Sequence, residues 1–241
     1  MAEVTWLKGV FYKIEQETHN TRRFYIEFPE VEKFDFIPGQ FVTMDLPIHE
    51  KKNLRWRSYS IASAPDGTNR IELVIVLALN GTGTSYLFDN IKEGMDVPMR
   101  GPLGKFVLHH PVETDICFVC TGTGIAPFRA MIQDFKNTGK ACKNLYLIYG
   151  TRVEGDILYR SEFEQLEKDM PNFHYIPVLS RGDENWKGEK GYVHAVYERI
   201  FADKRPVQFM LCGWTAMINE AKDRMKAMGY EKKDIHYELY G

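Results

Sequence analysis

The run Gly122-Thr123-Gly124 lies between a strongly apolar segment, Ile116–Cys120, and an amphipathic one. Glycines at such a point let the backbone approach a phosphate group. The free N–H groups and the dipole of the helix that follows then favour its negative charge. Pro127 falls in the first helical turn, where a proline costs no hydrogen bond. An ordinary tight turn would have the same spacing, but the strand before and the helix after favour a dinucleotide-binding turn.

This turn departs from the standard dinucleotide fingerprint. Pro127 stands in place of the third glycine, and no acidic residue ends the second strand to bind a ribose. Instead, Arg152 follows the second strand, and Ser180 and Arg181 follow the third. Guanidinium and hydroxyl groups suit a 2′-phosphate, which favours NADPH over NADH. The alternative is that these side chains are merely solvated.

A second candidate anion site lies earlier in the chain. In Arg57-Ser58-Tyr59-Ser60, strand alternation puts Arg57 and Tyr59 on one face and the two serines on the other. Many half-buried strands alternate in this way. However, a helix start, which also favours anions, follows some 25 residues later at Gly81-Thr82-Gly83-Thr84-Ser85.

The elements that must position these residues differ between the two halves of the chain. The first half has short segments rich in β-branched and aromatic residues, separated by turn residues such as Pro38-Gly39 and Gly101-Pro102. This pattern predicts a small antiparallel Greek-key β-barrel over residues 1–110, interrupted by one short helix. The strands predicted most clearly are Val4–Ile14, Arg22–Phe28, Gln40–Leu46 and Arg70–Leu77, and the helix is predicted at about Thr84–Ile91.

Residues 111–241 instead alternate apolar runs with helical segments, which predicts a doubly wound parallel sheet covered by helices on both faces. Phe128, Met131, Ile132 and Phe135 follow helical periodicity. Ser161 and Glu164 are expected to form a capping box, and Thr215 to cap a last helix that closes at Gly229. The predicted strands are Ile116–Cys120, Leu145–Tyr149, Phe173–Leu179, Val207–Cys212 and Ile235–Tyr240.

Composition limits the remaining possibilities. The 241 residues are 44% hydrophobic and 27% charged with a net charge of −2, so nothing favours nucleic acid as the main partner. We expect a cytoplasmic protein with no membrane span, because no long apolar segment or export signal occurs. Cys117 and Cys120 are expected to be buried thiols in a strand. Neither iron–sulfur nor zinc spacing is present, so no metal site is expected.

Five motifs together resemble a known family. Their order and separations are those of ferredoxin–NADP reductases and related flavin oxidoreductases, over nearly the whole chain. They are Arg57-x-Tyr59-Ser60, Gly101-Pro102-x-Gly104-x-Phe106, Gly122-Thr123-Gly124-Ile125-Ala126-Pro127, Tyr149-Gly150-x-Arg152 and Cys212-Gly213. The ending His236-Tyr237-Glu238-Leu239-Tyr240 is also similar, although Gly241 follows, whereas plant-type members end on the aromatic residue itself.

The resemblance implies that the first domain binds FAD. Arg57 would contact the pyrophosphate, Tyr59 would pack against the isoalloxazine ring, and the Ser60 hydroxyl would hydrogen-bond near flavin N5. The helix start at Gly83 would take the other part of the pyrophosphate. The full set of residues implied is Arg57, Ser58, Tyr59, Ser60, Gly83, Thr84 and Ser85.

The second domain would bind NADP, with NAD as the alternative. Cys212 would lie beside the hydride-carrying carbon, Glu238 would help proton movement near the flavin edge, and Tyr240 would cover the ring face that the nicotinamide must reach. Ser60, Cys212 and Glu238 are therefore the expected catalytic residues. The other implied contacts are Thr123, Gly124, Arg152, Ser180, Arg181 and Gly213.

The activity implied is hydride transfer from NADPH, or NADH, to the flavin and then electron transfer to a protein carrier such as ferredoxin or flavodoxin. The segment from Ser180 to Tyr192 looks closer to the reductase components of bacterial oxygenases, many of which use NADH. Such a component, or a free-flavin or ferric reductase, is the first alternative. A non-catalytic electron-transfer subunit is less favoured, because no further cysteine cluster follows. An acidic carrier would suit the basic residues Lys222, Arg224, Lys226, Lys232 and Lys233.

Overall fold

The computed structural model describes residues 5–109, 111–140 and 142–240. The predicted strand start at Val4, the predicted domain boundary at His110 and the residue Gly241 lie outside the described residues. By their contacts, residues up to 108 group with residues 126–134, and residues 109–125 group with those from 135 onward. We describe these two units separately.

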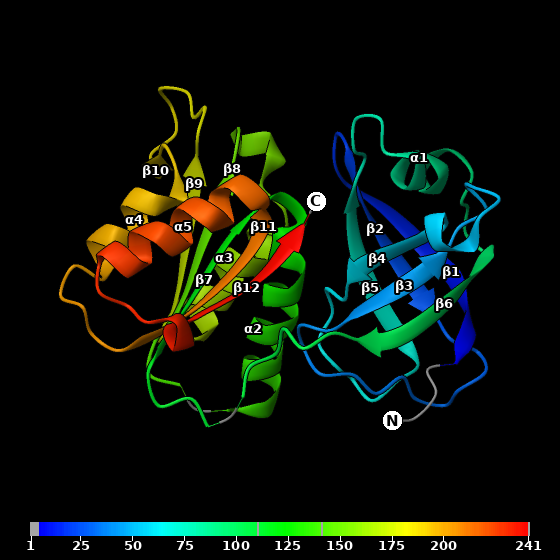
Figure 1. Ribbon diagram of the computed structural model, residues 1–241, viewed down its shortest axis with the longest axis horizontal. Coiled ribbons are helices and arrows are strands. Elements are labelled where there is room, and N and C mark those ends of the chain that lie inside the picture. Colours follow the sequence, from blue (N-terminus) through cyan, green and yellow to red (C-terminus); the bar gives the residue numbers. More distant parts are fainter. Residues whose placement is uncertain (1–4, 110, 141, 241) are drawn as a thin grey trace. The chain divides into compact units, whose positions relative to one another are not determined.

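The first unit is an antiparallel barrel (Figure 1). Its strands lie in the order β4-β3-β6-β1-β2-β5, so β6 pairs with both β1 and β3, which are distant in sequence. The barrel closes where the residues just after β4 pair with β5. Ile61 forms an antiparallel bridge with Leu73, and the Ala62 N–H donates to the Glu72 carbonyl at 2.8 Å. The strands are β1 Trp6–Thr18, β2 Thr21–Glu27, β3 Phe41–Asp45, β4 Trp56–Ser60, β5 Arg70–Val76 and β6 Asp96–Leu103.

Apolar side chains on alternate strand positions fill the barrel. Phe11, Phe24, Ile26, Leu73 and Met99 are completely buried in one cluster. Each contributes about 1.5–3 kcal/mol by leaving water, so the barrel forms around this core. The prediction of an antiparallel barrel is confirmed, and its helix α1 spans Thr82–Asp89.

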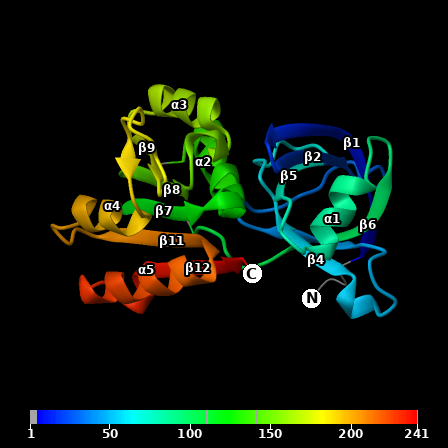
Figure 2. The same ribbon diagram turned by 90° about the horizontal axis from the view of Figure 1, so that it is seen from above.

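The second unit is a parallel sheet in the order β10-β9-β8-β7-β11-β12, which confirms the predicted doubly wound α/β fold. Figure 2 shows α3 on one side of the sheet and α4 and α5 on the other. The strands are β7 Asp115–Thr121, β8 Leu145–Thr151, β9 Phe173–Leu179, β10 Glu189–Lys190, β11 Val207–Trp214 and β12 Ile235–Tyr240. The helices of this half of the chain are α2 Ala126–Thr138, most of which groups by its contacts with the first unit, and α3 Arg160–Asp169, α4 Val193–Ile200 and α5 Thr215–Ala227.

Two helix starts differ from the sequence-based expectation. The capping box predicted at Ser161 is wrong, because α3 begins after Tyr159, whose φ is 53° and whose side chain makes no capping bond. A capping box is present instead at Glu231 and Asp234, around a short 3₁₀ turn. The last helix starts at Thr215, so the N-cap is Trp214 and not the predicted Thr215. None of the helices in the described ranges is long and apolar enough to cross a membrane.

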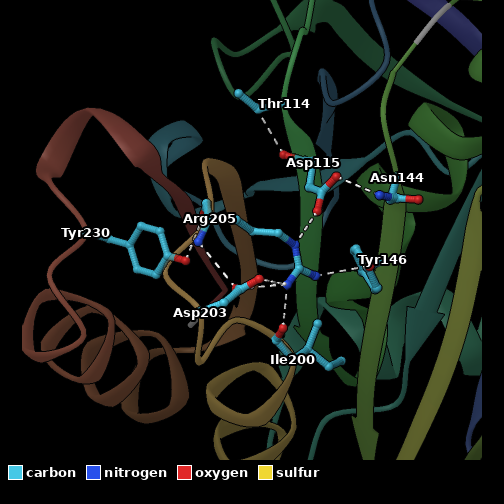
Figure 3. Close-up of polar contacts among 8 residues, drawn as sticks. All are labelled: Thr114, Asp115, Asn144, Tyr146, Ile200, Asp203, Arg205 and Tyr230. Carbon is cyan, nitrogen blue, oxygen red and sulfur yellow. Dashed lines mark hydrogen bonds and ion pairs between the residues drawn. The ribbon is translucent and has the colours of Figure 1, made fainter.

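A polar cluster ties together the amino ends of the central strands (Figure 3). The Asp115 carboxylate, with 1% of its side chain exposed, lies 2.8 Å from Arg205 Nε and accepts a hydrogen bond from Asn144 at 2.8 Å. The same guanidinium donates to the Tyr146 hydroxyl at 3.2 Å and to Asp203 at 3.0 Å. These contacts compensate the buried charge of Asp115 and fix β7 to β8 and to the start of β11.

Candidate functional site

In the barrel, Arg57 lies at the amino end of α1. Its Nη1 donates to the carbonyls of Leu54 and Trp56 at 3.0 and 2.8 Å, and its Nη2 to Thr82 Oγ1 at 3.2 Å. The helix can approach because residue 83 is glycine: an added Cβ would lie 2.8 Å from Arg57 Cγ. The guanidinium charge and the positive end of the helix dipole therefore coincide, which suits a phosphate group.

The side chains that follow Arg57 differ in their exposure to solvent. Ser58 is exposed, and its Oγ lies 2.9 Å from Thr43 Oγ1. Tyr59 packs partly against the barrel core, and burial raises the pKa of its hydroxyl to about 12. Ser60 is only 5% exposed. At neutral pH, Tyr59 is thus an uncharged ring beside the Arg57 charge.

Thr84 and Ser85 organise the loop before α1. Thr84 Oγ1 accepts a hydrogen bond from the Ala78 N–H at 3.1 Å and donates to the Gly81 carbonyl at 3.0 Å. The Ser85 N–H donates to the same carbonyl at 2.9 Å. The Thr84 hydroxyl therefore shapes the loop that precedes the anion site.

In the second unit, two of the predicted glycines allow β11 to approach the end of β7 and the 3₁₀ turn Gly122–Ile125 that follows it. A Cβ at Gly124 would lie 2.5 Å from the Cys212 carbonyl oxygen, and one at Gly213, where φ is +135°, would lie 2.4 Å from Thr121 Oγ1. Gly122 differs: its φ is +55°, and an added Cβ would have nothing within 4 Å. The open backbone for a phosphate is thus at Gly122 and Thr123, just before the start of α2.

The basic residues predicted for a 2′-phosphate are brought together by strand pairing. The Ser180 N–H donates to the Thr151 carbonyl at 3.0 Å and the Arg181 N–H to the Arg152 carbonyl at 2.8 Å, so the β8–β9 pairing continues to this point. Both guanidinium groups are exposed, and neither has an ion-pair partner within the described ranges. The structure therefore places two available cations at one corner of the sheet.

Two residues near this corner were missed by sequence reasoning. Lys190 pairs in register with Leu179, and Tyr192, two residues further along, is 73% exposed. Lys190 ends β10, and Tyr192 follows this strand of only two residues, which is too short to produce a periodic pattern. Lys190 and Tyr192 add a cation and an aromatic surface beside Ser180 and Arg181.

Cys212, Glu238 and Tyr240 meet on β11 and β12, because Cys212 is in register with Glu238 and Trp214 with Tyr240. Burial raises the pKa of the Cys212 thiol well above its usual value, the Glu238 carboxylate raises it further, and a hydrogen bond with Tyr240 opposes the rise. The thiol therefore stays protonated at neutral pH. It is 0% exposed, so a ligand can reach it only if a neighbouring group moves.

The two cysteines that the sequence analysis considered lie in β7. Cys117 and Cys120 are fully buried free thiols, as expected, and burial raises the pKa of both.

The basic residues considered for an acidic carrier pair in part with carboxylates of this chain. Arg224 pairs with Glu198 and Glu220 at 3.0 and 2.8 Å. The chain's own carboxylates thus neutralise much of that surface; Lys233 is likewise 2.9 Å from Glu231.

A cavity of about 510 Å³ lies in the second unit, and it is lined by residues at the starts of β7, β11 and β12, such as Thr114, Val207 and Asp234. This is the opposite edge of the sheet from the glycine turn. In open α/β sheets, ligands bind at the carboxyl ends of strands. The candidate nucleotide site is therefore at the carboxyl edge and not in this cavity.

Comparison with known proteins identifies both units. Residues 9–108 match the oxidoreductase FAD-binding domain, and residues 118–223 match the oxidoreductase NAD-binding domain. Ferredoxin–NADP reductase B of Sorangium cellulosum is 33% identical over 229 residues, which are 91% of each chain.

Longer proteins are also similar. The anthranilate 1,2-dioxygenase electron transfer component of Acinetobacter baylyi is 30% identical over 80% of this chain, which spans 54% of that relative. Among solved structures, the cytochrome P450 reductase GcoB of Amycolatopsis has a TM-score of 0.87 at 24% identity, covering 99% of this chain and 71% of that one. At that identity the likeness establishes the fold.

Proposed function

The chain belongs to the ferredoxin–NADP reductase-like family of FAD- and NAD(P)-dependent oxidoreductases, and we propose that it oxidises NADPH in preference to NADH and reduces a separate protein carrier, ferredoxin or flavodoxin. The relative that matches over 91% of both chains carries the ferredoxin–NADP reductase name. A match over that share of both chains favours the protein carrier as acceptor.

The barrel residues fit the FAD expected there. The Arg57 guanidinium and the first N–H groups of α1 converge where a pyrophosphate would lie, and Gly83 keeps that approach open. Tyr59 offers an uncharged ring for packing against the flavin, and the buried Ser60 hydroxyl is the proposed hydrogen-bond partner near N5. When bound, FAD supplies a ring system that accepts two electrons as hydride and releases them singly or together.

The observation that carries the NADPH proposal is the pair of exposed guanidinium groups, Arg152 and Arg181, at the ends of β8 and β9, which have no ion-pair partner among the described residues. A 2′-phosphate is an anion and accepts charge-assisted hydrogen bonds from guanidinium groups, whereas NADH has an uncharged ribose hydroxyl at that position. Ser180 and Lys190 supply further donors at the same corner. The open backbone at Gly122 and the start of α2 would hold the pyrophosphate.

On the opposite side of the turn, Cys212, Glu238 and Tyr240 are the proposed contacts of the nicotinamide half. The neutral Cys212 thiol presents no charge beside the reacting carbon. Glu238 would hold or move a proton near the flavin edge. Positioning a hydride donor and acceptor in near contact can supply about 7–11 kcal/mol of the barrier.

Arg181→Ala tests the nucleotide preference. We expect KM for NADPH to rise about 10- to 100-fold, as for loss of a charge-assisted contact of about 1.5–3 kcal/mol, and KM for NADH to change less than threefold. Steady-state kinetics with an artificial electron acceptor measure both constants. Lys168→Ala, an exposed cation on α3, is the control and should alter neither. Equal rises for both nucleotides would contradict a 2′-phosphate site at Arg181.

A second function is favoured by the 30% identity with an oxygenase electron transfer component over 80% of this chain. In that case, the acceptor is an oxygenase or its own ferredoxin. Anaerobic turnover with ferredoxin, flavodoxin, free FMN and ferric citrate, each at equal concentration, separates protein carriers from small-molecule acceptors. Fast reduction of FMN or ferric citrate alone would contradict a protein carrier.

A further inference from the structure

Trp214 is a large aromatic side chain that the sheet leaves uncovered. It ends β11, two residues after Cys212, and is 67% exposed although its register partner is Tyr240. Its position is fixed: the Trp214 N–H donates to Thr121 Oγ1 at 3.3 Å, which ties it to the residue before the glycine turn. This bond places the backbone of Trp214 at the carboxyl edge of the sheet, next to the residue that precedes Gly122, and leaves the indole exposed there.

The strand order decides which part of a dinucleotide can reach this indole. The glycine turn follows β7, which lies between β8 and β11. Arg152, Arg181 and Lys190 belong to the β8–β9–β10 side, whereas Trp214 and Cys212 belong to the β11–β12 side. A dinucleotide with its pyrophosphate at the turn therefore places its 2′-phosphate on one side and its nicotinamide on the other.

We propose that Trp214 is a binding residue for the nicotinamide half of the dinucleotide and discriminates between its oxidised and reduced forms. This inference rests on the proposed function. The oxidised pyridinium ring is a cation, and an indole face attracts cations by its quadrupole, whereas the reduced ring is neutral. Trp214 therefore strengthens NADP⁺ binding more than NADPH binding and slows release of the oxidised product.

The test compares the FAD-loaded protein with its Trp214→Leu variant by isothermal titration with NADP⁺ and with 2′,5′-ADP, which lacks the nicotinamide half. We expect the variant to weaken NADP⁺ binding about tenfold and to leave 2′,5′-ADP binding within twofold. Trp214→Phe should restore most of the loss, because it keeps an aromatic face. Tyr237→Leu, which removes another exposed aromatic ring from β12, is the control and should bind both ligands normally.

Retained 2′,5′-ADP binding shows in the same titration that the variant is folded. Anaerobic titration with NADPH of protein whose flavin has first been reduced with dithionite, so that no hydride is transferred, should give a loss at least threefold smaller than that for NADP⁺. Unchanged NADP⁺ affinity in Trp214→Leu, or equal losses for NADP⁺ and NADPH, would overturn the inference and leave the proposed function standing. A wild-type protein that binds neither NADP⁺ nor 2′,5′-ADP would overturn the proposed function, and this inference with it.

Discussion

Several residues of the candidate site owe their properties to burial. Burial raises the pKa of Tyr59 from 10 to about 12 and the pKa of the Cys212 thiol well above its usual value, so both groups are uncharged at neutral pH and stay so in moderately alkaline solution. The charges are left to exposed or half-exposed groups such as Arg57 and Arg181. The surfaces proposed for the flavin and nicotinamide rings are therefore neutral, and those proposed for phosphates are cationic.

Ser60→Ala isolates the hydroxyl proposed to contact flavin N5. We expect FAD to remain bound and its reduction by NADPH to slow about 3- to 10-fold, the range for loss of one hydrogen bond. Anaerobic stopped-flow absorbance measures the rate. Ser161→Ala, which removes an exposed hydroxyl from α3, is the control and should reduce at the wild-type rate. Wild-type kinetics in Ser60→Ala would contradict the role of Ser60.

At the scale of elements, the two edges of the parallel sheet have different tasks. The carboxyl edge holds the glycine turn and the basic corner, while the amino edge holds the Asp115–Arg205 cluster (Figure 3). That cluster compensates one buried carboxylate with a guanidinium that also packs 4.5 Å from the Phe201 ring centre. It is a stability element placed away from the chemistry.

Arg205→Ala should lower the free energy of unfolding by about 3–5 kcal/mol, because it leaves the Asp115 charge buried and unpaired. Urea denaturation followed by circular dichroism measures this loss. Arg199→Ala, whose exposed side chain pairs with Glu189, should cost no more than about 1 kcal/mol. Similar losses in the two variants would show that Asp115 is compensated in another way.

The periodicity of hydrophobic residues and the positions of turn residues predicted most of the helices and strands. The elements that were missed or misplaced have physical explanations. Strand β6 was missed because Pro98, Gly101 and Pro102 indicate turns, yet pairing with β1 and β3 on both sides overrides that local preference. The start of α3 was misplaced because Tyr159 adopts a left-handed conformation that sequence does not reveal.

The candidate site was predicted unevenly for a similar reason. Arg57 and Gly83 were each recognised, but their contact joins residues 26 positions apart and appears only in the fold. The close approach of Gly124 to the Cys212 carbonyl also joins residues far apart in sequence, while the predicted place of Gly124 beside the dinucleotide stays a prediction. The exposure of Trp214 and Tyr192 depends on what packs around them, which no local pattern encodes.

At the scale of the whole molecule, each unit supplies one half of a redox reaction. The barrel carries the residues proposed for FAD, and the parallel sheet those proposed for the nicotinamide nucleotide. The proposed hydride transfer requires the nicotinamide and the flavin to react with each other. Reduction of the bound FAD by the nicotinamide nucleotide is therefore a stricter test than the binding of either one alone.

The most direct test mixes the FAD-loaded protein anaerobically with NADPH and, in parallel, with NADH, and follows flavin absorbance. The account predicts rapid bleaching by NADPH and bleaching by NADH that is at least about tenfold slower at equal subsaturating concentrations, as expected for a 2′-phosphate contact. Bound FAD that neither nucleotide bleaches would contradict the central claim that this chain is an NAD(P)H-dependent reductase.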